Sequence, residues 1–154
     1  TYGTWLHGDD RGAVRRNGNN LYQGPKIVAS IPLREKMADA RQGKPSVLDA
    51  HQRRCVEAAI KEVCDFRNYL LRAVNVRTNH AHAVASAAVK PEKLVNDFKV
   101  YATKRLRKEG MCDGGQKIWS RGASTRYLWK PRHVEAAVDY VKYCQEDIPF
   151  EFDD

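Results

Sequence analysis

The stretch 69–87, YLLRAVNVRTNHAHAVASA, decides how the rest of the chain is arranged. Residues 69–77 are mostly aliphatic, aromatic or β-branched, which is typical of a strand. The Thr78–Asn79 pair then predicts a tight turn, and residues 80–87 again combine small, polar and branched side chains. These patterns together predict an antiparallel hairpin whose second strand begins at residue 80.

Amphipathic segments on both sides of the hairpin predict helices. Residues 46–65 repeat apolar side chains at helical spacing, after a Pro-Ser pair that marks a helix start. Residues 91–108 form a second such segment with Pro in its first position, and a final helix is expected after residue 131. A short helix over 33–41 also fits the pattern.

Two further strands would complete the sheet. Residues 117–127 are expected to contain one, interrupted at Ser120-Arg121-Gly122, and residues 1–6 suit the end of another. The order strand–helix–strand–strand–helix–strand–helix matches an α+β fold, the ferredoxin-like split βαβ sandwich. We therefore expect an antiparallel sheet with helices on one face and a C-terminal helix that bears a tyrosine.

The length of 154 residues and a hydrophobic fraction of 42% suit a single domain. We divide it into an irregular N-terminal segment (1–45), a core (46–146) and an acidic tail (147–154). No apolar run approaches the length of a membrane span, and we expect no membrane partner. The four cysteines lack Cys-x-x-Cys spacing, so we expect reduced thiols and a cytoplasmic, nucleoid-associated protein.

Charge is distributed unevenly along the chain. The net charge is +8, with 27 Lys+Arg against 19 Asp+Glu. The last nine residues contain five acids and no base, so the rest of the chain sums to +13. Such a body attracts a polyanion, and nucleic acid is the leading candidate.

The pair His80 and His82 is the first candidate for chemistry. Side chains at positions i and i+2 of a strand share a face, so both imidazoles can reach one ion. Two neutral imidazoles suit a divalent transition metal, or Mg²⁺ or Mn²⁺ with added oxygen ligands. The alternative is a solvated strand face that carries two polar residues.

Tyr140 is the second candidate. Helical geometry places it at the edge of the apolar stripe formed by Val134, Val138 and Val141, whereas Tyr143 lies nearly opposite the stripe. An edge position allows the phenol to emerge beside the sheet. The alternative is a half-buried tyrosine that only packs.

A basic helix is the third candidate. Residues 99–108, KVYATKRLRK, contain five cations, and residues 117–122, KIWSRG, place cations around a tryptophan. Cations interleaved with aromatic rings suit single-stranded nucleic acid, because bases stack on rings while cations contact phosphates. A solvated helix face and a core tryptophan are the alternative. The candidate contacts are Lys99, Lys104, Arg105, Arg107, Lys108, Trp119 and Arg121.

Four segments, in order and at similar spacing, resemble those of the single-tyrosine HUH transposases, including REP-associated tyrosine transposases. Residues 76–82, VRTNHAH, resemble the family's PNHVH segment, with Thr in the place of Pro. Residues 97–101 and 117–122 resemble the helix and the strand that follow. Residues 137–145, AVDYVKYCQ, resemble the helix that supplies the nucleophile.

The resemblance implies that His80 and His82 are metal ligands and that Tyr140 is the nucleophile. In relatives a Gln or Asn one turn after the tyrosine supplies a third ligand, and here Cys144 occupies that place. A thiolate is a soft ligand that matches Mg²⁺ poorly, so Gln145 is expected instead.

The implied activity is metal-dependent cleavage and transfer of single-stranded DNA through a 5′-phosphotyrosine, with Mg²⁺ or Mn²⁺ as cofactor. The expected substrate is a hairpin with adjacent guide bases, contacted also by Asn79 and Arg126. Arg126 or Lys142 could assist ionisation of the phenol. The protein could be a homodimer or a monomer. Alternatives are a rolling-circle replication initiator and a non-catalytic module that binds single-stranded nucleic acid.

Overall fold

The structure is a computed structural model of the chain, and it describes residues 1–4, 29–41 and 43–143. Its residues group into two compact units. The first contains the described residues up to Val47 and residues 115–124, and the second contains residues 48–114 and those from Thr125 onward. Gln145 and the acidic tail (147–154) lie outside the described residues.

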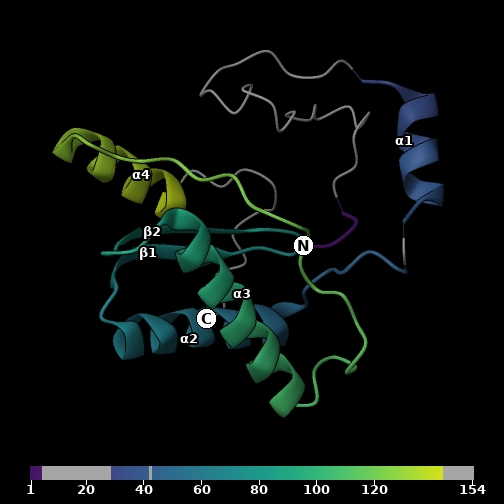
Figure 1. Ribbon diagram of the computed structural model, residues 1–154, viewed down its shortest axis with the longest axis horizontal. Helices are drawn as coiled ribbons and strands as arrows, with labels where there is room; N and C mark the ends of the chain where they lie inside the picture. The colour runs from purple at the N-terminus through teal and green to yellow at the C-terminus, as the bar shows by residue number, and fades with distance from the viewer. Residues whose placement is uncertain (5–28, 42, 144–154) are drawn as a thin grey trace. The chain divides into compact units, whose positions relative to one another are not determined.

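The second unit contains most of the secondary structure (Figure 1). Its elements are, in chain order, α2 (Ala50–Arg67), β1 (Leu70–Val76), β2 (Ala81–Ser86), α3 (Pro91–Lys108) and α4 (Pro131–Tyr143). The first unit contains α1 (Ile31–Asp39), which is capped by the Ser30 hydroxyl. The short helix predicted over 33–41 is therefore present two residues earlier, inside a segment that was predicted to be irregular.

The predicted hairpin is confirmed. β1 and β2 pair in antiparallel register from Leu70 opposite Ser86 to Val76 opposite Ala81, with an irregularity beside Arg72. The second strand begins at Ala81 and not at residue 80, because His80 belongs to the turn, where its carbonyl accepts the Arg77 N–H at 2.8 Å.

Helix α2 begins four residues later than the predicted start. The Asp49 carboxylate accepts the Gln52 N–H at 2.8 Å, and the Gln52 side chain accepts the Asp49 N–H at 2.9 Å. This reciprocal capping box satisfies two amides of the first turn, which the Pro-Ser pair upstream does not do. The helix ends at Asn68, which adopts the left-handed conformation with φ 55°.

Helices α2 and α3 pack against each other, and their contacts run in opposite order along the two helices. Tyr69, just after α2, donates to Asp97 near the start of α3, and Phe66 contacts Tyr101. Further along, Arg105 pairs with an α2 carboxylate. The shared apolar core contains Val56, Ile60 and Val63 of α2 and Phe98, Ala102 and Leu106 of α3.

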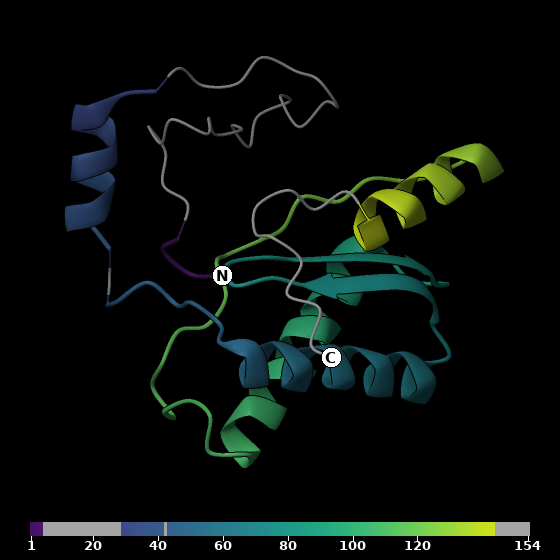
Figure 2. The ribbon, with the colours of Figure 1, turned by 180° about the vertical axis from the view of Figure 1, so that it is seen from behind.

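Helix α4 covers the side of the hairpin opposite α2 (Figure 1 and Figure 2). Val141 of α4 is buried with Ala73 of β1 and Val84 of β2, which are direct partners in the sheet. Helices therefore occupy both faces of the sheet. The helices were predicted on one face, with the tyrosine-bearing helix named apart from them. Here α2 covers one face, α3 packs against α2, and α4, whose apolar stripe also needs a surface to bury it, covers the other face.

The additional strands are absent from the part of the chain that the structure describes. Residues 117–127 form no strand, and the bend at Ser120-Arg121-Gly122, where Gly122 has φ 80°, prevents a continuous ladder. Residues 1–4 also form no strand; residues 5 and 6 lie outside the described residues. The α+β class is confirmed, with a two-stranded sheet in place of the predicted four-stranded one.

The cysteines at positions 55, 64 and 112 are free. Burial raises the pKa of the Cys64 thiol to about 11, so this side chain stays protonated and packs as a small apolar group. Within the described ranges no helix is long and apolar enough to cross a membrane.

Candidate functional site

The two histidines lie at the beginning of β2, on the side of the sheet that α4 covers. His82 stands opposite Asn75 in the register, and His80 lies in the preceding turn. Their ring centroids are 4.8 Å apart and their planes make an angle of 78°. Both side chains are half-buried. The two rings therefore lie side by side, as positions i and i+2 predict.

Asn79 orients the first imidazole. Its side-chain oxygen lies 2.6 Å from Nδ1 of His80. Because an amide oxygen can only accept, Nδ1 carries the proton in this hydrogen bond, and the lone pair of that tautomer lies on Nε2. A neighbour that fixes the tautomer in this way is the usual companion of a metal-binding histidine.

Tyr140 of α4 lies beside this pair. Its ring centroid is 6.0 Å from that of His82, with an interplanar angle of 87°, and its side chain is 51% exposed. The phenol is thus partly held against an imidazole and partly open to solvent. Tyr143 is 68% exposed and has no ring contact with the histidines, as its position on the helix predicts.

Asn75 connects the strand to the tyrosine helix, a role that was not predicted. Its side-chain NH₂ donates to the Val141 carbonyl at 3.0 Å. Because Asn75 faces His82 in the sheet and Val141 follows Tyr140, this bond sets the phenol's helix over the imidazoles. The signal in the sequence was a polar residue between two valines, at a position that faces His82 across the hairpin.

Arg77 is a second residue near this turn for which no role was predicted. It is only 6% exposed and directly follows β1. Its backbone N–H donates to the carbonyl of His80 at 2.8 Å, and this bond closes the turn that carries Asn79 and His80. A buried cation is unusual in a small domain.

The distance between the two histidine rings allows one shared divalent ion. Two imidazoles bound to one ion through bonds of ~2.1 Å would have centroids roughly 4.5–5.2 Å apart, and the observed separation is 4.8 Å. Among the residues described, no group of three or more His, Cys, Asp or Glu side chains could hold a metal ion. The expected third ligand, Gln145, and its rival Cys144 lie outside the described residues.

The predicted nucleic-acid contacts on α3 differ in their surroundings. Lys104, Arg107 and Lys108 are exposed. Arg105 instead binds Glu62 of α2 at 3.0 Å. Lys99 is half-buried, and burial lowers the pKa of its amine. These exposed cations all belong to α3, the helix that packs against α2.

The remaining predicted contacts divide between the two units. Trp119, half-buried, and Arg121, exposed, belong to residues 115–124 of the first unit. Arg126 is exposed and lies in the second unit, in the segment that leads into α4. The structure thus brings together His80, His82, Asn79 and Tyr140, and it places Arg126 in the same unit.

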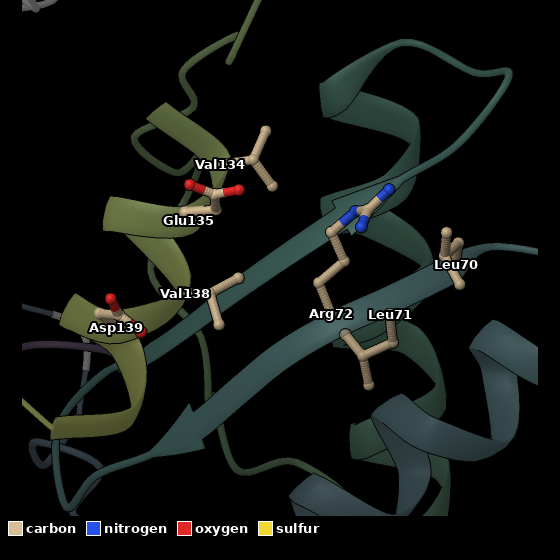
Figure 3. Close-up of a pocket in the computed structure, with 7 residues that line it drawn as sticks. All are labelled: Leu70, Leu71, Arg72, Val134, Glu135, Val138 and Asp139. Atoms are coloured by element: carbon tan, nitrogen blue, oxygen red, sulfur yellow. The ribbon is translucent and has the colours of Figure 1, made fainter. Parts of the chain in front are cut away.

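A cavity of about 610 Å³ lies between α4 and the start of β1. Figure 3 shows Arg72 of β1 on one side, and Glu135 and Asp139 of α4 on the other. It adjoins the Leu70 end of the hairpin, whereas the histidines lie at the opposite end. Two carboxylates disfavour a DNA phosphate, so we assign the cavity no part in the chemistry.

Comparison with known protein families gives a match over most of the chain. The family model described as "Transposase IS200 like" matches residues 40–143. This range includes α2, the hairpin, α3 and α4, and therefore every described residue of the histidine–tyrosine group. No curated protein and no solved structure matches the chain significantly.

Proposed function

The chain belongs to the IS200-like transposase family, and from this premise we propose that it cuts and rejoins single-stranded DNA through Tyr140. The observation that carries the proposal is the meeting of Tyr140 with the histidine pair. The ring of Tyr140 lies 6.0 Å from that of His82, which lies 4.8 Å from that of His80. A nucleophile and a pair of metal ligands at one place are the parts that phosphoryl transfer requires.

Tyr140 performs the bond exchange. Its phenolic oxygen loses a proton and attacks the scissile phosphorus in line with the 3′-oxygen, which leaves and takes up a proton. The products are a 5′-phosphotyrosine and a free 3′-hydroxyl. A 3′-hydroxyl of a second strand end then attacks the phosphotyrosine, which restores a phosphodiester and releases Tyr140. The covalent intermediate conserves the bond between the two steps.

His80 and His82 would hold a divalent ion, Mg²⁺ or Mn²⁺, with Gln145 as the proposed third ligand. When bound, the ion supplies Lewis-acid polarisation of the scissile phosphate. Asn79 keeps the His80 ring in a tautomer that can bind the ion. Half-burial of both imidazoles limits competition from water, and exposure of half the Tyr140 side chain leaves the phenol accessible to a DNA strand.

The test is covalent capture. The protein is incubated with 5′- and 3′-labelled single-stranded hairpin oligonucleotides in the presence of Mg²⁺ or Mn²⁺, and adducts are separated under denaturing conditions. We expect an adduct that retains the DNA 3′ of the cut, that requires the metal, and whose labelled peptide contains Tyr140. The Tyr140→Phe variant should bind DNA without forming an adduct.

Tyr143→Phe is the matched control, because Tyr143 lies on the same helix and is more exposed. This variant should form the adduct at the parent rate. An adduct formed by Tyr140→Phe at the parent rate, or an adduct mapped to another residue, would show that the assignment is wrong. Binding with no adduct in any metal would favour a non-catalytic binding module.

A further inference from the structure

Two aromatic rings stack on each other at the surface of the segment that leads into α4. The centroids of Tyr127 and Trp129 are 5.0 Å apart, and the planes make an angle of 14°. Trp129 is 82% exposed and Tyr127 is 57% exposed. Large aromatic side chains gain free energy from burial, so an exposed parallel pair indicates a surface that receives a partner.

The residue between them explains why both rings face outward. Leu128 packs against the buried cluster of Ala73, Val84 and Val141. In an extended chain, neighbouring side chains point to opposite sides, so the inward Leu128 directs Tyr127 and Trp129 to the surface. The cluster that anchors them also contains Val141, the residue next to Tyr140. The stack and the proposed nucleophile therefore share one support.

The chain on either side of this pair carries charge of a single sign. Residues 125–134 contain three cations and no acidic residue. Of these cations, Arg126 and Lys130 immediately flank the aromatic pair, and both are exposed. Phosphates are the natural counterpart of such cations, and flat aromatic rings are the natural counterpart of unpaired bases. A protein partner would more often meet a less charged aromatic surface.

We propose that Tyr127 and Trp129 form a platform on which an unpaired base of single-stranded DNA stacks, while Arg126 and Lys130 contact the adjoining phosphates. The choice of DNA rests on the proposed function. The platform is attached through Leu128 to the cluster under α4, so a base held there belongs to the strand presented to Tyr140. Stacking on a ring tolerates any base, and the platform therefore positions the strand without reading its sequence.

The test uses equilibrium binding to an oligodeoxythymidine of about 14 nucleotides, measured by fluorescence anisotropy with all proteins in the Tyr140→Phe background. Trp129→Ala should lower affinity about 5- to 150-fold, the usual range for loss of one stacked base, and Trp129→Phe should retain most of it. Tyr143→Ala, which removes another exposed aromatic of the same unit, should change little. Unfolding temperatures should stay equal, because the deleted rings are exposed.

A scan with single abasic nucleotides, placed in the single-stranded flank of a hairpin oligonucleotide whose duplex fixes the register, then identifies the stacked base. One abasic position should weaken binding by the parent protein and have no further effect on Trp129→Ala. The platform would be overturned if the parent, Tyr127→Ala and Trp129→Ala bound DNA with equal affinity. It would also be overturned if an abasic nucleotide lowered affinity equally for the parent and for Trp129→Ala. If the parent protein forms the Tyr140 adduct but these affinities are equal, the proposed function stands and the platform is wrong. If one abasic position weakens binding as expected but no adduct forms, the platform stands and the proposed function is wrong.

Discussion

The side chain of Asn75 donates a hydrogen bond to the carbonyl of Val141 at 3.0 Å, and this contact joins the hairpin to the tyrosine helix. It lies next to both halves of the candidate site, because Asn75 pairs with His82 in the sheet and Val141 adjoins Tyr140. Asn75 is therefore a positioning residue in the proposed function.

Asn75→Ala should reduce formation of the Tyr140 adduct about 3- to 10-fold, a modest loss because Val141 still packs on the sheet. The free energy of unfolding should fall by about 1 kcal/mol from the lost hydrogen bond. DNA affinity should stay unchanged, which separates a positioning defect from lost binding. Arg72→Ala, an exposed change on the same strand, is the control for stability. Unchanged adduct formation in Asn75→Ala would show that the bond has no positioning role.

His82→Ala should lower metal-dependent adduct formation by at least roughly 100-fold, because one of two imidazole ligands is lost. The rate is measured while Mn²⁺ is titrated, since weaker metal binding appears as a higher concentration for half-maximal rate. His51→Ala is the matched control, because His51 is exposed on α2, where it contacts Arg54. A wild-type Mn²⁺ titration for His82→Ala would remove this residue from the metal site.

The cations of α3 should contribute unequally to DNA affinity. Lys104, Arg107 and Lys108 are exposed, and replacing all three with Ala should reduce the slope of log affinity against log salt by about 2, at roughly 0.7 per phosphate contact on single strands. Arg105→Ala should leave the slope unchanged, because its guanidinium already binds Glu62. A slope that responds to Arg105→Ala and not to the triple variant would reverse this assignment.

Asp97 should stabilise the fold in a pH-dependent way. The hydrogen bond from Lys93 is the largest cause that lowers the pKa of this buried carboxyl, the Tyr69 hydroxyl acts in the same direction, and burial opposes them. A lowered pKa means that the stabilisation is complete above the unfolded pKa of about 3.9 and is lost as pH falls through the folded value.

Asp97→Asn should therefore lower the free energy of unfolding by about 1–3 kcal/mol at pH 7. The difference from the parent should shrink as pH falls below about 4. Denaturant unfolding at a series of pH values measures this trend. Tyr69→Phe is the comparison variant, because it removes one hydrogen bond and no charge, so its effect should vary less with pH. A pH-independent effect of Asp97→Asn would mean that the carboxylate charge contributes nothing.

Local sequence determined the hairpin, the helices and the shared face of the two histidines. These features depend on patterns of a few residues, such as alternation in residues 69–87 and helical spacing in residues 91–108, which act before any tertiary contact forms. The start of α2 was also encoded locally, by Asp49 and Gln52, although the Pro-Ser signal upstream obscured it.

Only the tertiary structure decided where α4 packs, that Tyr140 meets His82, and that Asn75 joins the two. These relationships depend on side chains far apart in sequence that become neighbours when Ala73, Val84 and Val141 bury their surfaces together. It likewise decided that residues 117–127 form no strand, because pairing needs a partner edge and a backbone without the bend at Gly122. Spacing along one segment carries no information about such distant partners, so the histidine pair could be predicted from geometry and the tyrosine's position could not.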